Sequence, residues 1–578
     1  MIDLIEVSDS IYTTALPSNA PLHASALPCL PSPSPPTPCP PELESPDAAA
    51  PAPEPLPGPA YPPTPSQAIC IKAEGKASLK NASKPCEINK NKIAQKENIR
   101  MKNKSMKDFF VVKTSKAEKG QLDLAVAKCI YATNSPFQIV ENDSFRDMLS
   151  KLRPGYTPPD RHRIGEELLN KTYEEVMKEY DTTLRGKTVC MSIDGWSNIH
   201  NESVICVSVT SEGKSYIIDS IDYEPQHTGD NLQIIMQNCI RKAKRLYDCS
   251  TASVVTDNAS NMCKMRRQLH TEDFILTYGC SAHLLNLLVK DLEEEGTRKE
   301  LSDVIKYFRN HHLQAFKLKK YGGKKLTLPA DTRWNTITDS MESYLKNLDV
   351  LEQVCLDESA NVNAGITLKV LSAEFSQRVK KYLRKLKPIS VALDKIQREN
   401  TLISECAEIW IEMKDEVLSN IKEKTEEMKV NERYATAITD GHCLANMLDP
   451  RYQGRRLSKE EKKKGTDLIN QICPDFMQIY MKYSAKIFPF CSQYFTNEVI
   501  HSMSPADWWK FFEPEFPDQK EENFPRMKLP RMLFTAVASS AGIERIFSMY
   551  GLVQSKIRNR LNNDKAAKLV KIYTSLNV

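Results

Sequence analysis

The sequence lacks the features of exported and membrane proteins. No run of apolar residues approaches the roughly 18 that a membrane-spanning helix needs. The chain starts MIDLIEVSDS, without the basic stretch and apolar core of a secretory signal. The 16 cysteines are scattered singly and form no Cys-x-x-Cys pair, which argues against a disulfide framework and favours a reducing compartment such as the cytosol or the nucleus. We therefore expect no contact with a membrane.

A large excess of one charge is also missing. The formal net charge of the 578 residues is only +5, too small by itself to indicate a polyanionic partner. Hydrophobic residues make up 41% and charged residues 26%, values typical of globular proteins, so most of the chain is expected to fold. A chain of this length has room for two to four domains, and no internal repeat is visible in it.

Proline and lysine are concentrated in the first part of the chain. Residues 1–66 hold 19 of the 35 prolines, a density that prevents regular helices and sheets and predicts a disordered Pro-rich arm over 1–71. Residues 72–119 carry 14 Lys/Arg against 5 Asp/Glu, which predicts a basic linker over 72–120. The arm is either a docking site for protein partners or a passive extension. For the linker there are three interpretations: it binds phosphates, it directs nuclear import, or it is a solvated run of charges without a further role.

The apolar spacing then changes from helical to strand-like. Apolar residues three and four apart predict a helical N-terminal domain over 121–185. Between 186 and 298, short β-branched runs alternate with amphipathic segments, and the runs SVICVSVT and SYIIDSID are separated by SEGK, which is typical of a hairpin turn. The order of three strands, helix, strand, helix, strand, helix predicts an α/β fold with a mixed sheet covered by helices.

The remainder of the chain is almost entirely helical in pattern. Residues 299–528 predict a large all-helical domain, in which Pro388 is expected to break or kink one long helix. Trp508 and Trp509 are expected to be core residues of this domain. A further helical region, with an amphipathic last segment, ends the chain over 529–578.

Two aspartates follow buried-looking strands directly. Asp194 ends the apolar run TVCMSID, and Asp257 ends ASVVTD. If neighbouring strands bring both carboxylates together, the pair can hold the divalent metal ions that phosphodiester chemistry uses. Either residue is equally well explained as an ordinary turn or cap aspartate. The spacing leaves a third ligand unassigned among 74 acidic residues.

Six motifs give the chain a resemblance to a known family. They are, in order, SIDGW, VVTDNASNM, YGCSAHLLNLLVKD, DTRWNT, LANMLDPRY and SSAGIERIFSMYGLVQSKIRNRL. In this order and at these separations they resemble the hAT superfamily of cut-and-paste DNA transposases, over about residues 135–578. The resemblance implies an RNase H-like mixed sheet that is interrupted after its fifth strand by a large all-helical insertion domain.

The resemblance also implies a catalytic site and a means of self-association. Asp194, Asp257 and Glu544 match the three carboxylates that bind two Mg²⁺ or Mn²⁺ ions in an active enzyme. Residues 529–578 match the C-terminal dimerisation region of the family. Glu544 is alternatively a helix-surface acid paired with Arg545 or Lys556.

Four further residues are implied as contacts to DNA. Cys280 and His283 match a Cys-x-x-His motif whose histidine lies near the scissile phosphate. Arg333 and Trp334 belong to the TRWN motif, whose tryptophan stacks on a flipped base. Half of a zinc site or plain packing is the alternative for the Cys and His, and a core position is the alternative for the tryptophan.

The BED zinc finger of many hAT proteins is not predicted. The four N-terminal cysteines lie in low-complexity sequence without a Cys-x-x-Cys or a nearby pair of histidines: Cys29, Cys39, Cys70 and Cys86. We therefore predict a nuclear, transposase-derived protein that binds DNA, dimerises and has become a domesticated regulator. An active transposase that uses two metal ions, and a protein-interaction scaffold without a nucleic-acid role, are the alternatives.

Overall fold

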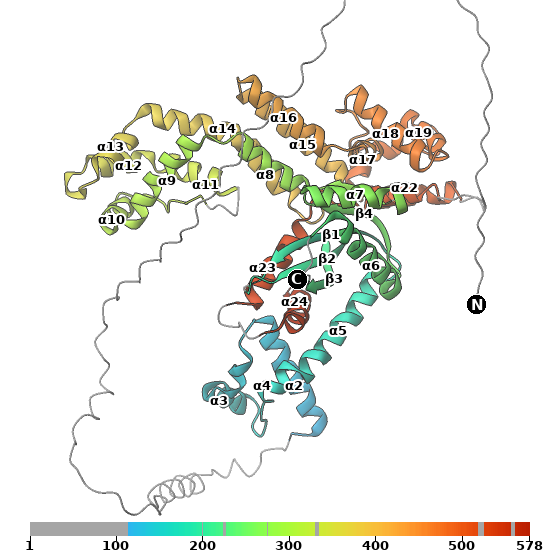
Figure 1. Cartoon of the computed structure of the whole chain (residues 1–578), viewed down its shortest axis with the longest axis horizontal. Helices are drawn as coiled ribbons and strands as arrows, with labels where there is room; N and C mark the ends of the chain where they lie inside the picture. Colours follow the sequence, from blue (N-terminus) through green and yellow to red (C-terminus); the bar gives the residue numbers. More distant parts are fainter. Residues whose placement is uncertain are drawn as a thin grey trace, which may run out of the picture. The chain divides into compact units, whose positions relative to one another are not determined.

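The computed structural model describes the part of the chain that begins at Thr114 (Figure 1). The described residues are 114–198, 200–222, 227–273, 275–329, 335–517, 525–555 and 561–577, and the side chains of 270–273 are excepted. The predicted Pro-rich arm, most of the basic linker, and the candidate DNA contacts Arg333 and Trp334 lie outside the described residues.

Helices come first, as the spacing of apolar residues predicts. They are α2 (Lys116–Ala132), the 3-10 helix η2 (Phe137–Glu141), α3 (Asp143–Leu152), α4 (Arg161–Gly165) and α5 (Glu167–Leu184). The first begins with a capping box, in which the Ser115 side chain and the Glu118 side chain each accept a hydrogen bond from the other's backbone. Asp123 on α2 is buried and joins the helices, because it accepts hydrogen bonds from Tyr156 and Arg163.

A five-stranded mixed sheet follows, which confirms the predicted α/β class. The strands are β1 (Thr188–Ser197), β2 (Ser203–Ser211), β3 (Lys214–Asp222), β4 (Ser250–Thr256) and β5 (Leu276–Gly279), and their spatial order is β3-β2-β1-β4-β5. The first three strands are antiparallel, whereas β4 is parallel to both β1 and β5. The predicted hairpin between β2 and β3 turns through Glu212 and Gly213, with φ of 50° and 75°, as a tight two-residue hairpin turn requires.

The two faces of the sheet belong to different cores. Val189, Met191 and Ile193 on one face of β1 lie in a core with residues of α5 and of α6 (Gly229–Tyr247). Cys190, on the opposite face, lies with Val255 and with the helices after β5 in a second core. The helix α7 (Ser260–Asp273) packs beside α6 and β5. Because side chains alternate along a strand, this division follows directly from the sequence of β1.

Helices occupy the long region after β5. In the described residues they are α8 (Ser281–Asp291), α9 (Glu295–Asn310), α10 (His312–Lys320), α11 (Asn335–Lys346), α12 (Leu348–Leu356), η3 (Glu358–Ala360), α13 (Ala364–Val370), α14 (Ala373–Ile396), α15 (Ile403–Asn420), α16 (Lys424–Ala437), α17 (Asp440–Leu448), α18 (Lys459–Ile472), α19 (Phe476–Ala485), η4 (Ser492–Phe495), α20 (Asn497–Ser502), α21 (Pro505–Phe512), η5 (Glu513–Glu515) and α22 (Lys528–Leu533). No helix among the described residues combines the length and apolarity that a membrane crossing requires.

Pro388 does not break its helix, contrary to one of the two expectations for it. α14 continues through this residue to Ile396. Pro388 lacks a backbone N–H and therefore cannot donate to the preceding turn. The residue is buried, and α14 packs against α8, α11 and α15. We attribute the continuity of α14 to this packing. The predicted core positions of Trp508 and Trp509 are confirmed, since each is only 2% exposed.

The chain returns to the sheet through the segment 535–540. Val537 pairs with Leu402 of the α14–α15 connection, and the Ala538 N–H donates to the Thr401 carbonyl at 2.8 Å. The last helices, α23 (Ala541–Val553) and α24 (Asn563–Asn577), then lie beside the sheet (Figure 1). Gly542 allows this approach, because a Cβ atom there would lie 2.1 Å from the Ser215 hydroxyl.

Much of the apolar surface expected to drive self-association is used inside the chain. Ile546 and Val553 are at most 2% exposed and belong to the core of the sheet. Phe547 packs on Trp196, with the ring centroids 5.6 Å apart. Leu552 is the large apolar residue of α23 that stays exposed. Dimerisation through 529–578 remains a prediction, with less free apolar surface than the sequence suggests.

Candidate functional site

Asp194 and Asp257 extend from neighbouring strands at the same end of the sheet. β1 and β4 are parallel and adjacent, and Ser192 lies opposite Val255. Each aspartate comes two residues after its member of this pair, so both carboxylates project from the same face at the same level. Adjacent strands are about 5 Å apart, which places the two side chains next to each other.

Glu544 reaches the same place from α23. The helix follows the return segment, whose Ser540 N–H donates to the Cys280 sulfur at 3.4 Å and whose Ala538 carbonyl accepts from Ser281 at 3.2 Å. These bonds fix the start of α23 to the start of α8. The charges of Asp257 and Glu544 both raise the pKa of Asp194, and we refer to these three residues as the acidic group.

The electrostatics of the group follow from partial burial and like charge. Burial, together with the carboxylates of Asp257 and Glu544, raises the pKa of Asp194 to about 7. A hydrogen bond of 2.7 Å from the Gly195 N–H acts in the opposite direction. Burial also raises the pKa of Glu544, against the influence of His283 and Arg545, although as a residue Glu544 is exposed.

The basic residues near the group are engaged elsewhere. Arg545 binds Glu399 at 2.7 Å and the Gln397 carbonyl at 3.1 Å, so it is not the ion-pair partner of Glu544 that the sequence offered as an alternative. The other such partner, Lys556, lies outside the described residues. Among the described residues, no salt bridge joins the three carboxylates to a Lys, Arg or His.

Cys280 and His283 differ in their access to this site. Cys280 is fully buried at the start of α8, and its N–H donates to the Thr256 carbonyl at 2.6 Å. Burial raises the pKa of its thiol. His283 is half-buried and close enough to Glu544 to lower the pKa of that carboxylate. In this conformation Cys280 positions the strand and helix ends, whereas His283 faces the acidic group.

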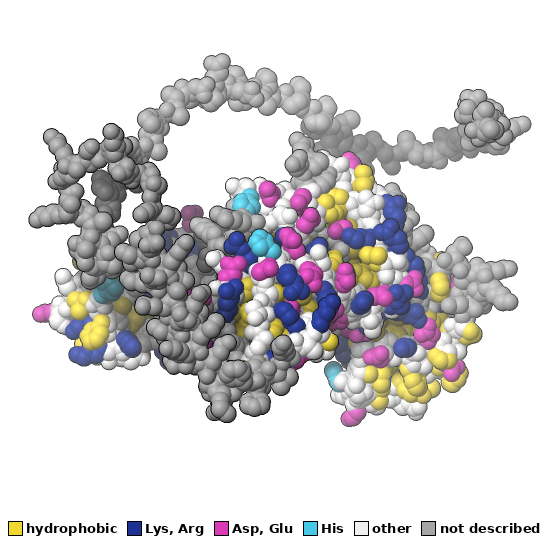
Figure 2. All heavy atoms as spheres, turned by 90° about the horizontal axis from the view of Figure 1, so that it is seen from below, with side chains coloured by type: hydrophobic (Ala, Val, Ile, Leu, Met, Phe, Trp, Pro, Cys, Tyr) yellow, Lys and Arg dark blue, Asp and Glu magenta, His cyan; other side chains and the backbone are white. Residues whose placement is uncertain are grey.

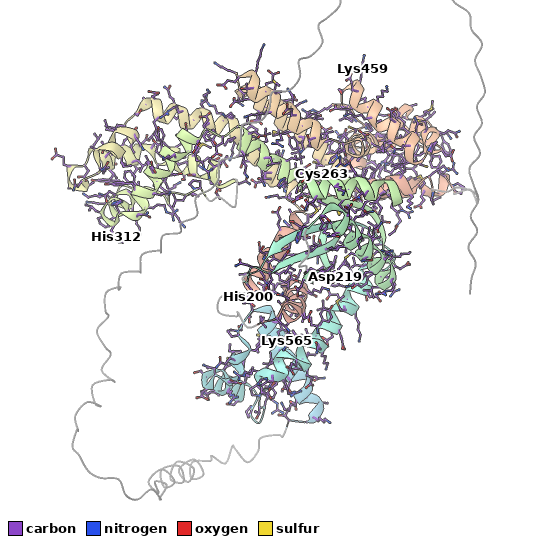
Figure 3. The ribbon with its side chains drawn as sticks, viewed as in Figure 1. His200, Asp219, Cys263, His312, Lys459 and Lys565 are labelled. Atoms are coloured by element: carbon purple, nitrogen blue, oxygen red, sulfur yellow. The ribbon has the colours of Figure 1, made fainter. Side chains whose placement is uncertain are left out.

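Sequence reasoning missed three residues that shape the site. Arg266 on α7 donates to the Asp257 carbonyl oxygen and to the sulfur of Cys263, which is labelled in Figure 3. Asn258 donates to the Cys280 carbonyl at 3.2 Å. His227 donates to or accepts from Ser203 at 2.7 Å, and its ring would lie 3.3 Å from a Cβ atom on Gly195. No spacing rule separates these residues from the many other polar residues of the chain.

The donor chemistry of the acidic group fits Mg²⁺ or Mn²⁺, because three carboxylates supply only oxygen ligands. The raised pKa of Asp194 comes first from burial and then from the like charges of Asp257 and Glu544. In this conformation, and within the described residues, no three His, Cys, Asp or Glu side chains are close enough to form a ready-made metal-binding group.

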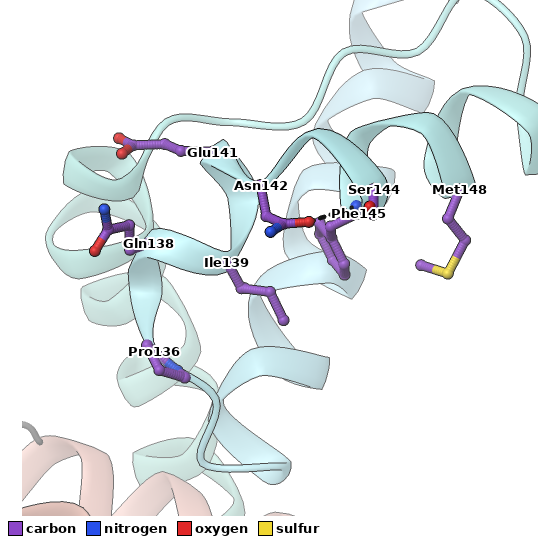
Figure 4. A pocket seen from close by; sticks show the side chains of 8 residues that line it. All are labelled: Pro136, Gln138, Ile139, Glu141, Asn142, Ser144, Phe145 and Met148. Atoms are coloured by element: carbon purple, nitrogen blue, oxygen red, sulfur yellow. Dashed lines mark hydrogen bonds between the residues drawn. The ribbon is translucent and has the colours of Figure 1, made fainter. Parts of the chain in front are cut away.

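Two cavities lie away from the acidic group. The first, about 720 Å³, is lined by residues of η2 and α3, including Ile139, Phe145 and Met148 (Figure 4). The second, about 930 Å³, lies between the β2–β3 hairpin end of the sheet and the helices after β5. Glu212, Glu399 and Arg531 are among its lining residues. Neither cavity contains a residue of the predicted site.

The basic side chains of α14 are partly neutralised by acidic neighbours. In the α14 segment RVKKYLRKLK, Arg378 pairs with Glu300, and Lys385 pairs with both Glu294 and Glu426. On the face drawn in Figure 2, Lys/Arg and Asp/Glu side chains are interspersed over much of the surface. Surface charge on α14 is therefore a weaker argument for phosphate binding than its sequence suggests.

Comparison with known proteins adds two likenesses. A family described as "Domain of unknown function (DUF659)" matches residues 159–310, which contain the whole sheet together with Asp194, Asp257 and His283. The Zea mays proteins "Putative AC transposase" and "Putative AC9 transposase" are each 25% identical over 228 residues, which cover 35% of this chain. The matched part spans 28% and 27% of those two proteins. The chain is therefore transposase-like over about a third of its length.

Proposed function

We propose that this protein is a nuclear hAT transposase-derived protein that binds DNA, self-associates and acts as a domesticated regulator, built on an RNase H-like sheet with a helical insertion. The strand order β3-β2-β1-β4-β5 and the long helical region after β5 support the fold. The likeness to the two maize transposases supports DNA as the kind of partner. Nuclear location and self-association rest on the resemblance of the motifs.

The observation that carries the proposal is the convergence of three carboxylates from separate parts of the chain. Asp257 and Glu544 both act electrostatically on Asp194, although Glu544 comes 287 positions after Asp257 in the sequence. Each carboxylate makes ionisation of the others less favourable, and groups with such perturbed pKa values are concentrated at functional sites.

The three carboxylates would hold Mg²⁺ or Mn²⁺, which activates a nucleophile and stabilises the leaving oxygen of a phosphodiester when bound. Asp194 then loses the proton that its raised pKa lets it keep near neutral pH. Gly195 holds one oxygen of Asp194 in place through its N–H, and His283 faces Glu544 from α8. The full burial of Cys280 limits its role to keeping α8, β4 and α23 in register.

The test measures metal binding and DNA binding separately. We expect Mg²⁺ or Mn²⁺ to raise the melting temperature of the full chain, and we expect Asp194→Asn combined with Asp257→Asn to remove that rise. The control is Asp248→Asn, an exposed aspartate after α6 that pairs with Lys244. An equal metal response in the double variant and the control would refute the site. Absence of DNA binding by fluorescence anisotropy would refute the proposed partner.

The second candidate function is an active DDE-type cut-and-paste transposase that uses two metal ions. The specific observation that favours it is the retention of all three carboxylates in one group. Nicking and strand transfer with Mn²⁺ on the ends of a candidate element separate the two functions. A wild-type chain that binds DNA and leaves it intact supports the regulator, whereas product that disappears in Asp194→Asn supports the enzyme. If the chain binds neither metal nor DNA, the remaining alternative is a protein-interaction scaffold.

A further inference from the structure

The region around α10 carries positive charge without any acidic residue. Between residues 304 and 329 the sequence holds seven Lys/Arg and no Asp or Glu. Most of this stretch is the end of α9, the helix α10 and the turn after it. Such a stretch contrasts with the chain as a whole, in which 79 basic residues face 74 acidic ones. Its positive charge therefore lacks neighbours in sequence that would neutralise it.

One face of α10 anchors the helix. Gln314 donates to the Ala360 carbonyl at 2.7 Å, and Lys317 pairs with Asp357 at 2.7 Å. Leu318, on the same face, is 7% exposed. These residues are three and four apart, as the packed face of a helix requires. The helix is thus held in place without using its opposite face.

The opposite face combines basic and apolar side chains. Phe316 is 62% exposed and Leu313 is 45% exposed, and Lys319 and Lys320 follow them on the same side of the helix. His312, labelled in Figure 3, begins this face. None of the ion pairs formed among the described residues involves either lysine. Leu313 and Phe316 thus give this face exposed apolar surface directly beside exposed lysines.

The turn after α10 extends the basic face. Gly322 adopts a φ of 86°, and the Gly323 N–H donates back to the Leu318 carbonyl at 2.8 Å, which ends the helix and reverses the chain. Lys324 and Lys325 follow and are both exposed. The Lys324 N–H donates to the Asn347 side chain at 2.6 Å, so the backbone of this extension is fixed.

We propose that this α10 face, defined as Leu313, Phe316, Lys319, Lys320, Lys324 and Lys325, binds an unpaired strand of DNA. The lysines match the spaced negative charges of a backbone, and the Phe316 ring offers a surface on which a base stacks. Duplex DNA keeps its bases inside and gives the exposed ring nothing to stack on. The inference rests on the proposed function for the choice of DNA as partner, and it names the form of DNA that this surface takes.

The experiment compares matched variants of the full chain in fluorescence anisotropy, with a 20-nucleotide dT strand and a 20-base-pair duplex as probes. Phe316→Leu keeps the apolar character and removes the aromatic ring, whereas Phe316→Trp keeps a ring. Lys319→Gln with Lys320→Gln removes two charges. The control is Lys463→Gln with Lys464→Gln, which removes two equally exposed charges from α18, a helix with Glu460 and Glu461 in its first turn.

We expect Phe316→Leu to weaken binding of the dT strand at least about fivefold, since base stacking on an aromatic ring contributes this much or more. Phe316→Trp should bind like the wild type. The double Lys319/Lys320 variant should reduce the magnitude of the log–log salt slope by about 1.4, because each phosphate contact to a single strand contributes about 0.7. The control should change neither quantity, and the duplex should respond little to Phe316→Leu.

Three outcomes would overturn the inference, and they are distinguishable from failure of the proposed function. If the wild type binds the strand and all variants bind it equally, the α10 face is not the site while DNA remains the partner. If Phe316→Leu weakens strand and duplex alike, the ring does not select unpaired bases. If the wild type binds neither form of DNA but binds phosphatidylserine vesicles, both proposals are wrong and the face is a membrane contact.

Discussion

Asp449 and Asp194 are two carboxylates with restricted solvent access, and they differ in the charge of the groups around them. Asp449, directly after α17, is fully buried and accepts hydrogen bonds from the Arg451 backbone N–H at 3.0 Å and from its guanidinium at 3.0 and 2.8 Å. Asp194, near the end of β1, is half-buried and receives one bond from its own neighbour Gly195. Burial and the negative charges of Asp257 and Glu544 raise its pKa.

The difference in partners distinguishes a carboxylate that stabilises the fold from one that we propose to bind a ligand. A buried carboxylate normally needs a partner, because desolvation disfavours its charged form. The partner of Asp449 lies two residues away, so the DPRY motif is complete in itself. The carboxyl group of Asp194 has no salt bridge among the described residues, and in our proposal a bound metal ion supplies the positive charge. The same substitution at the two positions should therefore have opposite effects on stability.

The largest effect is expected at Asp449. Asp449→Asn leaves the Arg451 guanidinium, whose side chain is 21% exposed, without its counter-charge. Removing one partner of a buried pair destabilises a protein by about 3–5 kcal/mol. We expect a loss of this order in the free energy of unfolding, measured by chemical denaturation. A loss below about 1 kcal/mol would mean that the ion pair does not hold this turn.

Asp194→Asn should stabilise the metal-free protein at pH 8. The rise of the Asp194 pKa to about 7 means that the folded chain holds this proton more tightly than the unfolded chain, in which an aspartate has its ordinary value. The stabilisation is complete below the unfolded pKa, and it is lost as pH rises toward about 7. Because Asp194 is half-buried, we expect a gain of about 2 kcal/mol from the substitution at pH 8 and little change at pH 4.

The measurement is a denaturation series from pH 4 to pH 8 with a chelator present. The wild type should lose stability across this range relative to Asp194→Asn. A variant that is less stable than the wild type at pH 8 would show that the charge of Asp194, like that of Asp449, stabilises the fold. Addition of Mg²⁺ should favour the wild type over the variant.

The buried amine of Lys571 should give the opposite pH dependence of stability. Lys571 on α24 is 7% exposed, and its Nζ donates to the Ile218 carbonyl at 3.4 Å. Burial and the nearby charge of Lys242 lower its pKa to about 8, and Asp219 partly opposes them. The folded chain therefore releases this proton more readily than the unfolded chain, and stability should rise between about pH 8 and pH 10.

Lys571→Met should remove that rise and stabilise the protein at pH 7 by about 1–2 kcal/mol. The matched control is Lys568→Met on the same helix, because Lys568 is half-buried and binds the Asn170 side chain. Thermal denaturation at pH 7 and pH 10 gives both quantities. A variant of Lys571 with an unchanged pH dependence would show that the amine is solvated.

The sequence predicts the fold best in segments where apolar residues recur at a regular spacing. Alternation in β1 and the SEGK turn predict the hairpin and the mixed sheet, because a one-residue change of register would move every side chain to the other face. Pro388 led to the expectation of a helix break, because helix propensity describes an isolated helix. In the structure α14 packs against several other helices and continues through this residue. The use of Ile546 and Val553 inside the core is also invisible in a one-dimensional pattern, which does not state what an apolar face packs against.

The candidate site is only partly accessible to sequence reasoning. Strand ends point to Asp194 and Asp257, since parallel neighbours place such residues side by side. Glu544 came from resemblance alone, because its position depends on hydrogen bonds between the return segment and α8 that no local pattern encodes. Arg266 and His227 were missed for the same reason. Their partners are backbone atoms or side chains brought near by folding.

The smallest expected effect is the most specific test of the acidic group. Glu544 is exposed as a residue, so solvent screens its charge, and Glu544→Gln should change the free energy of unfolding by less than about 1 kcal/mol. Its charge nevertheless contributes to the raised pKa of Asp194, after burial and after Asp257. The variant should therefore lower the pH at which Asp194 titrates, by less than Asp257→Asn does. Carboxyl-carbon NMR of Asp194 in the three proteins measures this order directly. An Asp194 titration that responds to Asp257→Asn and ignores Glu544→Gln would place Glu544 outside the group and leave a site of two aspartates.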